Sequence, residues 1–322
     1  MGKTTRRVVI TKVKGGDLAK KLEEALQEIG FKAKGKVLIK PNMCMPVYVP
    51  GAVTSPEVVY HLVKLFRNSA EEVIVGESDG YNYSCDLAFE KTGMKEAAEK
   101  AGGKIMNLSR DKLVQVNIEG FRVKRLFLPK TLFEVDSIVN VPVMKTHEFT
   151  IYSGALKNLF GLIPDRKRIF LHPYIDEVLF ALQKLIKPIT VMDALTAMEK
   201  NGPTRGLPVN MDLILTSNCP VALDLVATEI MGLDWRTISH LDYIVRKTGV
   251  DRGKIEVIGR MEYSRRFMPP VIDLPVKMQL VIYRHELVTK AFFSNPELVK
   301  ALQKIVMFYR GFKGLYLAKT SL

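Results

Sequence analysis

The sequence predicts an α/β protein with mainly parallel sheets flanked by helices, built as two lobes with a cleft between them and a basic helical C-terminal tail. Three observations carry this prediction. Apolar runs alternate with amphipathic stretches up to residue 110, the periodicity changes to two from residue 113, and the chain after residue 276 is strongly basic. We therefore expect an N-terminal α/β lobe over 1–110, a second α/β lobe over 111–275 and a basic amphipathic segment over 276–322.

The first lobe is predicted from strands and helices that follow each other in turn. Gly30 is a typical residue after a helix C-terminus, and Ser55-Pro56 supplies a hydroxyl cap and a first-turn proline to the next helix. Such alternation favours a parallel sheet with helices on both faces. The expected strands are 7–13, 36–40, 72–76 and 104–107, and the expected helices are 17–29, 55–68 and 86–100.

Polar side chains follow two of these strands. Lys40 and Asn42 come at the end of the second strand, and Asp79 follows the third. Open α/β proteins bind ligands outside the carboxyl ends of their strands, so all three are candidate ligand contacts. Two alternatives stay open: Pro41-Asn42 only makes a turn, or Asp79 only caps the next helix.

The second lobe begins with a hairpin signature, because 114–118 and 121–127 alternate with period two around Glu119-Gly120. Farther along, a buried strand over 189–193 ends in another candidate ligand contact, Asp193. The turn-rich stretch 197–206 is expected to be a loop, which either folds over the site or lies on the surface. The other expected elements are a helix over 174–185, a strand over 211–216 and a helix over 220–231.

The densest group of basic residues lies in the stretch 137–172, which holds two of the five histidines, three lysines and two arginines. An apolar run over 138–143 is expected to be a buried strand that Pro142 stops. Lys145 and His147 then lie in a loop at the end of the sheet, where a ligand is expected. Gly154 follows at the start of a helix whose free N–H groups favour an anion.

These residue types suit acid–base chemistry beside a carboxylate or phosphate. Neighbouring cations lower the pKa of a lysine, which can make it a base or nucleophile, and histidines titrate near neutral pH. As alternatives, 166–168 is a solvated turn and His172 caps a helix. The expected catalytic residues are Lys157, His147 and His172. The expected anion-binding residues are Lys145, Lys40, Asn42, Asp79, Gly154, Asn158, Arg166, Arg168 and Asp193.

Composition narrows the protein class. With 47% hydrophobic and 25% charged residues, the 322-residue chain is typical of globular proteins, and no apolar run is long enough for a membrane span. The polar N-terminus leads directly into a strand, so we expect a cytoplasmic protein. The three cysteines are widely separated, and we expect no iron–sulfur cluster from them.

The net charge of +14 favours anionic partners. The alternative is a solvated lysine-rich surface of the kind seen in heat-adapted proteins. The chain has no helix-turn-helix, RNP or zinc-finger pattern, which argues against nucleic-acid binding. GxxxxGK[ST], GxGxxG and HExxH are also absent from the sequence, so no common nucleotide or zinc motif is supported.

The C-terminal segment is the second feature with functional meaning. Residues 277–322 contain eight basic and two acidic residues, and a helix is expected to begin at 295–297 with apolar residues along one side. Such a segment lies on an acidic membrane, packs against a partner, or docks on its own domain.

Lys145-Thr-His147, the run GALKNLFG over 154–161 and Asp193-Ala194 with Asn201-Gly202-Pro203 resemble the uncharacterised family named domain of unknown function 362. The resemblance covers most of 36–260. Many members of that family carry a ferredoxin-like cluster motif, which the cysteines of this chain do not provide. The resemblance therefore implies an architecture and, as a further possibility, a ferredoxin-like protein partner.

A more distant resemblance is to the nickel-pincer lactate racemases, carried by the order strand, Lys145-Thr-His147, glycine-containing turn and Lys157. It implies that Lys157 holds a tethered nucleotide-type cofactor, that His147 ligates a metal and that His172 is the downstream acid–base residue. The chain departs from that family at Gly76-Glu77-Ser78, where the racemases have Gly-Thr-His, so one of their acid–base histidines is absent.

Three functions of different classes follow from the sequence. The first is an enzyme acting on a small anionic metabolite, of racemase, isomerase or oxidoreductase type, in a cleft between the lobes. The second is a scaffold or delivery protein that docks to a membrane or an iron–sulfur partner through its basic tail. The third and weakest is nucleic-acid binding, which predicts an affinity that falls steeply with salt.

Overall fold

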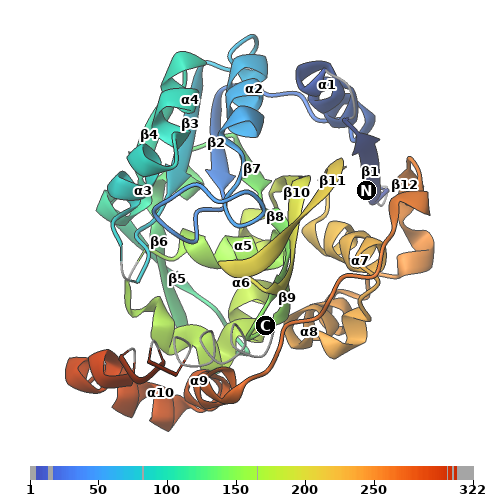
Figure 1. The fold of residues 1–322 in the computed structure, drawn as a ribbon. Coiled ribbons are helices and arrows are strands. Elements are labelled where there is room, and N and C mark those ends of the chain that lie inside the picture. Colours follow the sequence, from blue (N-terminus) through green and yellow to red (C-terminus); the bar gives the residue numbers. More distant parts are fainter. Residues whose placement is uncertain are drawn as a thin grey trace, which may run out of the picture. The chain divides into compact units, whose positions relative to one another are not determined.

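Ten of the described strands form one sheet in the order β12-β1-β11-β10-β7-β2-β3-β4, and β8 pairs with β10 and β9 (Figure 1). The computed structural model describes residues 5–13, 17–81, 83–164, 166–302, 304–306 and 308–309. The strands of the sheet are β1 (Arg7–Lys12), β2 (Lys36–Pro41), β3 (Glu72–Glu77), β4 (Lys104–Asn107), β7 (Ser137–Val141), β8 (Val143–His147), β9 (Ile151–Ser153), β10 (Ile189–Asn201), β11 (Arg205–Ser217) and β12 (Glu256–Ile258).

Parallel pairing dominates this sheet, as the alternation of apolar and amphipathic segments predicted. The pairs β7–β2, β2–β3, β3–β4, β10–β7, β10–β8 and β1–β12 are parallel, whereas β11 runs antiparallel to β1 and β10, and β9 antiparallel to β8. A separate hairpin joins β5 (Leu113–Asn117) to β6 (Arg125–Pro129), so the second predicted strand begins four residues later than expected. The predicted α/β class is confirmed.

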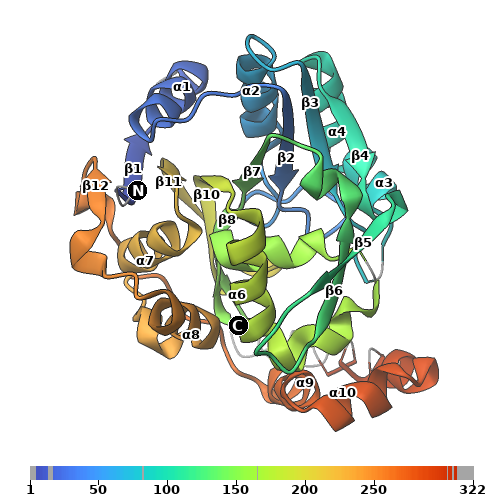
Figure 2. The same ribbon diagram turned by 180° about the vertical axis from the view of Figure 1, so that it is seen from behind.

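Helices flank both faces of the sheet (Figures 1 and 2). Val37 and Ile39 of β2 pack into one hydrophobic core with the apolar sides of α1, α2 and α4, and the intervening Leu38 does not belong to it, because successive side chains of a strand point to opposite faces. The helices are α1 (Leu18–Glu28), α2 (Pro56–Phe66), α3 (Cys85–Lys91), α4 (Met94–Lys100), α5 (Ala155–Asn158), α6 (Ile175–Ile186), α7 (Pro220–Ile230), α8 (Ser239–Thr248), α9 (Leu274–Arg284) and α10 (Glu286–Phe293).

The division of the chain differs from the two lobes expected from the sequence. Strands from both sides of residue 110 pair in the one sheet, since β2 lies between β7 and β3. One compact unit comprises the chain up to Arg166 together with Ile175–Val271, and a second comprises Lys167–Tyr174 and the chain from Ile272 onward. The change in periodicity at residue 113 suggested two separate lobes. Backbone hydrogen bonds between β2 and β7 instead join the two parts in one sheet.

Two predicted loops of the first unit are strands. Pro142 interrupts the ladder after β7, but the chain stays extended and continues as β8, so Lys145 and His147 lie in a strand and not in a loop at the end of the sheet. The stretch 197–206 is mostly the end of the β10–β11 hairpin, paired from Thr196↔Asn210 to Asn201↔Arg205. Cross-strand hydrogen bonding overrides the turn-forming residues there, and the turn itself is confined to 202–204.

The second unit is helical and basic. It contains α9, α10 and further helical residues at 296–302, 304–306 and 308–309. Contacts between aromatic rings join the 167–174 segment to these helices: the Phe170 and Phe293 rings are 6.4 Å apart, and the His172 and Tyr283 rings 4.6 Å apart. Residues 310–322 of the predicted basic tail lie outside the described residues.

Candidate functional site

The strand order reverses between β2 and β7. From β2 the chain proceeds to β3 and β4 on one side, and it then returns to β7 on the other side and continues to β10 and β11. The carboxyl ends of strands at such a reversal are where open α/β sheets bind ligands. Lys40 of β2, Glu77 of β3 and Asn140 of β7 all lie at this edge.

A buried polar cluster occupies this edge of the sheet. The Lys40 ammonium lies 2.6 Å from a Glu77 carboxylate oxygen, donates to the side-chain oxygen of Asn158 at 3.2 Å and donates to the carbonyl of Pro41 at 3.0 Å. Asn158 in turn donates to the side-chain oxygen of Asn140 at 2.8 Å. All four side chains are buried. The structure thus joins the predicted residues Lys40 and Asn158 by a direct hydrogen bond.

Sequence reasoning missed Glu77 and Asn140. A signal for Glu77 was available, because an acidic residue ending one apolar strand and a basic residue ending its parallel neighbour can form an ion pair. The Gly161 backbone lies directly against this pair: a Cβ atom there would be 2.8 Å from Glu77 Oε1 and 2.9 Å from Lys40 Nζ. The Lys40 charge is therefore compensated inside the protein.

A second cluster surrounds Lys145. Its amine donates to the Ala52 carbonyl at 2.6 Å and lies 3.5 Å from Cys44 Sγ. Asn42 donates to the same carbonyl at 2.6 Å, so two predicted anion-binding residues share one backbone oxygen. Lys145 is 1% exposed, and burial lowers the pKa of its amine, an effect that the neighbouring Cys44 opposes. Of the described residues, none forms an ion pair with Lys145 through a carboxylate.

Asp193 contacts the segment 42–55, which also holds Cys44 and Ala52, at its Ser55 end. Its carboxylate accepts from the Ser55 N–H at 2.7 Å and from the Leu195 N–H at 3.1 Å. The side chain is buried, and this burial raises the pKa of Asp193 to about 6 despite the two N–H donors. Asp193 thereby joins the N-cap residue of α2 to β10.

The helix start at Gly154 does attract an anion, and the anion is a side chain of the protein. The Asp224 carboxylate accepts from the N–H groups of Ala155 and Leu156 at 2.7 and 2.9 Å and from the Tyr152 hydroxyl at 2.7 Å. Burial raises the pKa of Asp224 to about 6. Sequence reasoning missed Asp224, which lies inside α7, about 70 residues farther along the chain.

Two of the expected catalytic residues, His147 and Lys157, lie on different elements, β8 and α5. His147 is buried on β8, and its Nδ1 accepts the N–H of Phe149 at 3.1 Å. Lys157 is half-buried on α5, and its charge acts together with burial to lower the pKa of His240 to about 3. Both ring nitrogens of the buried His240, another residue missed from the sequence, have no hydrogen-bond partner among the described residues.

The remaining predicted residues lie elsewhere. Asp79 accepts from the Cys85 N–H at 2.8 Å, which is the helix-capping alternative for this residue. Arg168 and His172 belong to the second compact unit, where Nδ1 of His172 lies 2.9 Å from the Ile169 carbonyl oxygen. Arg166 begins the 3₁₀ segment Arg166–Tyr174, and its side chain lies outside the described residues.

The β10–β11 hairpin is fastened to β8 beside His147. Arg205 forms an ion pair with the buried Glu148, and the Thr146 hydroxyl donates to the Lys200 carbonyl at 2.7 Å. Among the described residues, no three His, Cys, Asp or Glu side chains converge as they would to hold a metal ion by themselves. The metal expected at His147 stays a prediction.

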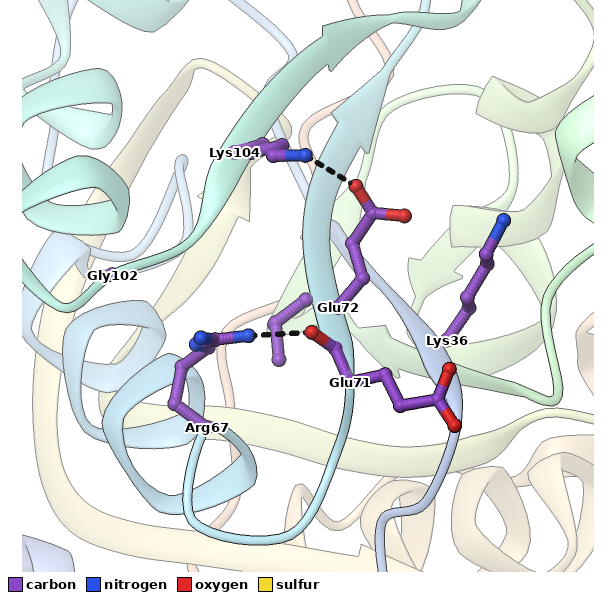
Figure 3. A pocket seen from close by; sticks show the side chains of 7 residues that line it. Lys36, Arg67, Glu71, Glu72, Gly102 and Lys104 are labelled. Carbon is purple, nitrogen blue, oxygen red and sulfur yellow. Dashed lines mark hydrogen bonds and ion pairs between the residues drawn. The ribbon is translucent and has the colours of Figure 1, made fainter.

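A hollow of about 420 Å³ lies at the opposite edge of the sheet, at the amino ends of β2, β3 and β4 (Figure 3). Its charges compensate one another: Lys104 pairs with Glu72 at 2.7 Å, and Arg67 donates to the Glu71 carbonyl at 2.8 Å. The predicted site residues are not among its lining residues.

Across the described part of the chain, no helix has both the length and the apolar character that crossing a bilayer requires.

Comparison with known proteins gives three findings. The model of the family described as Domain of unknown function (DUF362) matches residues 37–229. A thylakoid-associated protein of Synechocystis sp. is 28% identical over 238 residues, which are 69% of this chain and 73% of that protein. The lactate racemase apoprotein of Thermoanaerobacterium thermosaccharolyticum superposes with a TM-score of 0.47 and 14% identity, over 70% of this chain and 57% of the racemase chain.

Proposed function

Since the chain belongs to the DUF362 family, whose description assigns no activity, we propose from its own residues that it is an enzyme acting on a small anionic metabolite through acid–base chemistry of Lys145 and His147. The observation that carries the proposal is the burial of the Lys145 amine without a carboxylate partner among the described residues. A buried ammonium is costly, so such a lysine favours the neutral amine, which is a base.

His147 supplies the second group. It lies two residues from Lys145 on β8, and residues at that spacing point to the same face of a strand. With Nδ1 accepting the Phe149 N–H, the neutral imidazole carries its proton on Nε2 and can act as a proton donor. The amine removes a proton beside the substrate's carboxylate or phosphate, and the imidazole returns one to it.

The anionic character of the substrate is inferred from charge. The chain carries a net charge of +14, which raises the local concentration of anions around it. The nucleotide-type cofactor expected at Lys157 stays a prediction. Intact-protein mass spectrometry of material from the native host would detect such an adduct as added mass on the peptide that contains Lys157.

Proton exchange tests the proposed chemistry. We would incubate the protein in D₂O with a panel of carboxylated and phosphorylated metabolites and follow, by proton NMR, the loss of the signal next to the acidic group. Lys145→Met and His147→Gln are each expected to slow exchange by about 100-fold or more, the usual contribution of a positioned acid or base. His61→Gln, on the flank of α2, is the matched control and should keep the full rate.

Two results would contradict the proposal. One is exchange that proceeds equally in the wild type and in folded His147→Gln protein. The other is a panel in which no compound undergoes exchange and none raises the melting temperature, since a ligand that binds the native state stabilises it. Circular dichroism establishes that each variant is folded before its rate is compared.

Membrane association is a second candidate function, favoured by a separate observation. In the second compact unit, Leu287 is 80% exposed and Phe308 77% exposed, beside basic residues such as Lys290 and Lys304. Exposed apolar side chains combined with lysines bind the surface of an anionic bilayer. The thylakoid-associated name of the Synechocystis relative agrees with this candidate.

A further inference from the structure

We propose that Cys44 and Lys145 form a nucleophilic dyad, in which the Cys44 thiol reacts with low-molecular-weight disulfides and other soft electrophiles. The amine of Lys145 lies 3.5 Å from Cys44 Sγ, within the range of a hydrogen bond to sulfur. This assignment goes beyond the metabolite chemistry proposed above, because it concerns covalent modification of the protein and needs no substrate.

The Cys44 thiol donates to two backbone carbonyl oxygens, and the Lys145 amine lies beside it. Cys44 Sγ lies 3.2 Å from the Ala52 carbonyl oxygen and 3.6 Å from the Pro203 carbonyl oxygen. Lys145 donates to the same Ala52 oxygen at 2.6 Å, which holds its amine beside the sulfur. An amine fixed in this position can accept the thiol proton, and the resulting ammonium stabilises the thiolate. The lowered pKa of Lys145 agrees with a neutral amine that serves as the base.

Burial separates Cys44 from Cys85, whereas Cys219 is in the same burial class as Cys44. Cys44 is half-buried, and the Lys145 side chain beside it is buried. Cys85 is fully buried, and burial together with nearby Glu77 and Asp79 raises the pKa of its thiol. Cys219 is half-buried like Cys44 and is the N-cap residue of α7. It is therefore a stringent internal reference.

The reaction of Cys44 with a disulfide needs no oxidant other than the disulfide itself. Lys145 Nζ takes the Cys44 proton, and the thiolate attacks one sulfur of the disulfide. A new bond forms between Cys44 Sγ and that sulfur as the reagent's S–S bond breaks. The other half leaves as a thiolate and takes the proton back from Lys145. One disulfide bond is thus exchanged for another, and a thiol reductant reverses the reaction.

Alkylation kinetics test the dyad in the full chain. The protein would be treated with limiting iodoacetamide, and the labelled fraction of the Cys44 and Cys219 peptides followed by mass spectrometry. At pH 7 we expect Cys44 to react about tenfold faster than Cys219, because the Lys145 amine lies beside the Cys44 sulfur and can take its proton. In Lys145→Met the two rates should become similar. Equal rates in the wild type would overturn the proposal.

One further measurement, made on the wild type, keeps the test decisive if Lys145→Met does not fold. Glutathione disulfide should add one glutathione to the Cys44 peptide, removable by dithiothreitol and absent in Cys44→Ser. A thiol that takes iodoacetamide but no glutathione would refute the assignment to disulfides.

Discussion

At the scale of single residues, burial shifts the pKa values of several side chains more than neighbouring charges do. Lys145, Asp193, Asp224 and His240 are all buried, and desolvation is the largest cause of the pKa shift of each one. Each shift favours the neutral form of the side chain. Asp193 and Asp224, each with a pKa of about 6, are therefore the two of these groups that gain or lose a proton near neutral pH.

Asp193 makes a prediction about stability and pH. Its pKa is about 6 in the folded protein, against a usual value of 3.8, so the folded state holds the proton more tightly. This contribution to the free energy of unfolding is fully present below pH 3.8 and is lost as pH rises through about 6. Relative to Asp193→Asn, which cannot titrate, the wild type should lose about 2 kcal/mol between pH 4 and pH 7.

Urea unfolding of both proteins at several pH values measures this difference. Asp251→Asn, a change at an exposed aspartate, serves as the control and should track the wild type with pH. A gap between wild type and Asp193→Asn that stays constant, or that changes in favour of the wild type as pH rises, would show that burial does not raise this pKa.

At the scale of elements, the short helix α5 depends on a side chain from another helix. Isolated helices this short are unstable, and α5 spans only Ala155–Asn158. The Asp224 carboxylate from α7 accepts its first N–H groups and the Tyr152 hydroxyl. Asn158 at the other end bonds to Lys40. Contacts from α7 and β2 therefore fix the position of Lys157 between them.

Gly154→Ala tests this arrangement. The φ angle of Gly154 is −148°, which any residue adopts, so the constraint is space. A Cβ atom there would collide with the Tyr152 hydroxyl and the Asp224 carboxylate. Displacing that carboxylate should lower the free energy of unfolding by about 3 kcal/mol, as overpacking and lost hydrogen bonds do.

The matched control is Gly253→Ala, where the nearest atom is Asp251 Oδ1 at 3.4 Å from the added Cβ. Thermal unfolding should show a clear drop in melting temperature for Gly154→Ala and almost none for Gly253→Ala. If both variants melt together with the wild type, the Asp224 cap contributes little to the position of α5.

At the scale of the whole molecule, net charge and the apolar surface of the second unit act together. The full chain should co-sediment with vesicles that contain phosphatidylglycerol and not with pure phosphatidylcholine vesicles, and added salt should weaken binding. The double variant Leu287→Glu/Phe308→Glu should reduce binding by about tenfold or more, because it removes apolar contacts and adds like charge to the surface.

Leu113→Glu is the control for this experiment, because Leu113 is exposed on β5 in the first unit. It changes the net charge of the molecule in the same direction, by half as much. Binding that falls equally in Leu113→Glu and in the double variant would assign the effect to overall charge. Binding that survives the double variant would exclude the second unit as the membrane contact.

The sequence by itself determined the α/β class and most strands and helices of the first 110 residues, because these depend on local periodicity and capping. The helix predicted over 86–100 is instead two helices, α3 and α4, because Gly93 adopts a left-handed conformation between them. Only the tertiary structure decided that β2 pairs with β7 and that 197–206 belongs to a strand hairpin. It also decided that Glu77 and Asn140 bond to the predicted residues Lys40 and Asn158, and that Asp224 accepts from the N–H groups that follow Gly154. Partners so far apart in sequence leave no local pattern, since strand pairing and the burial of charge are settled when distant segments meet.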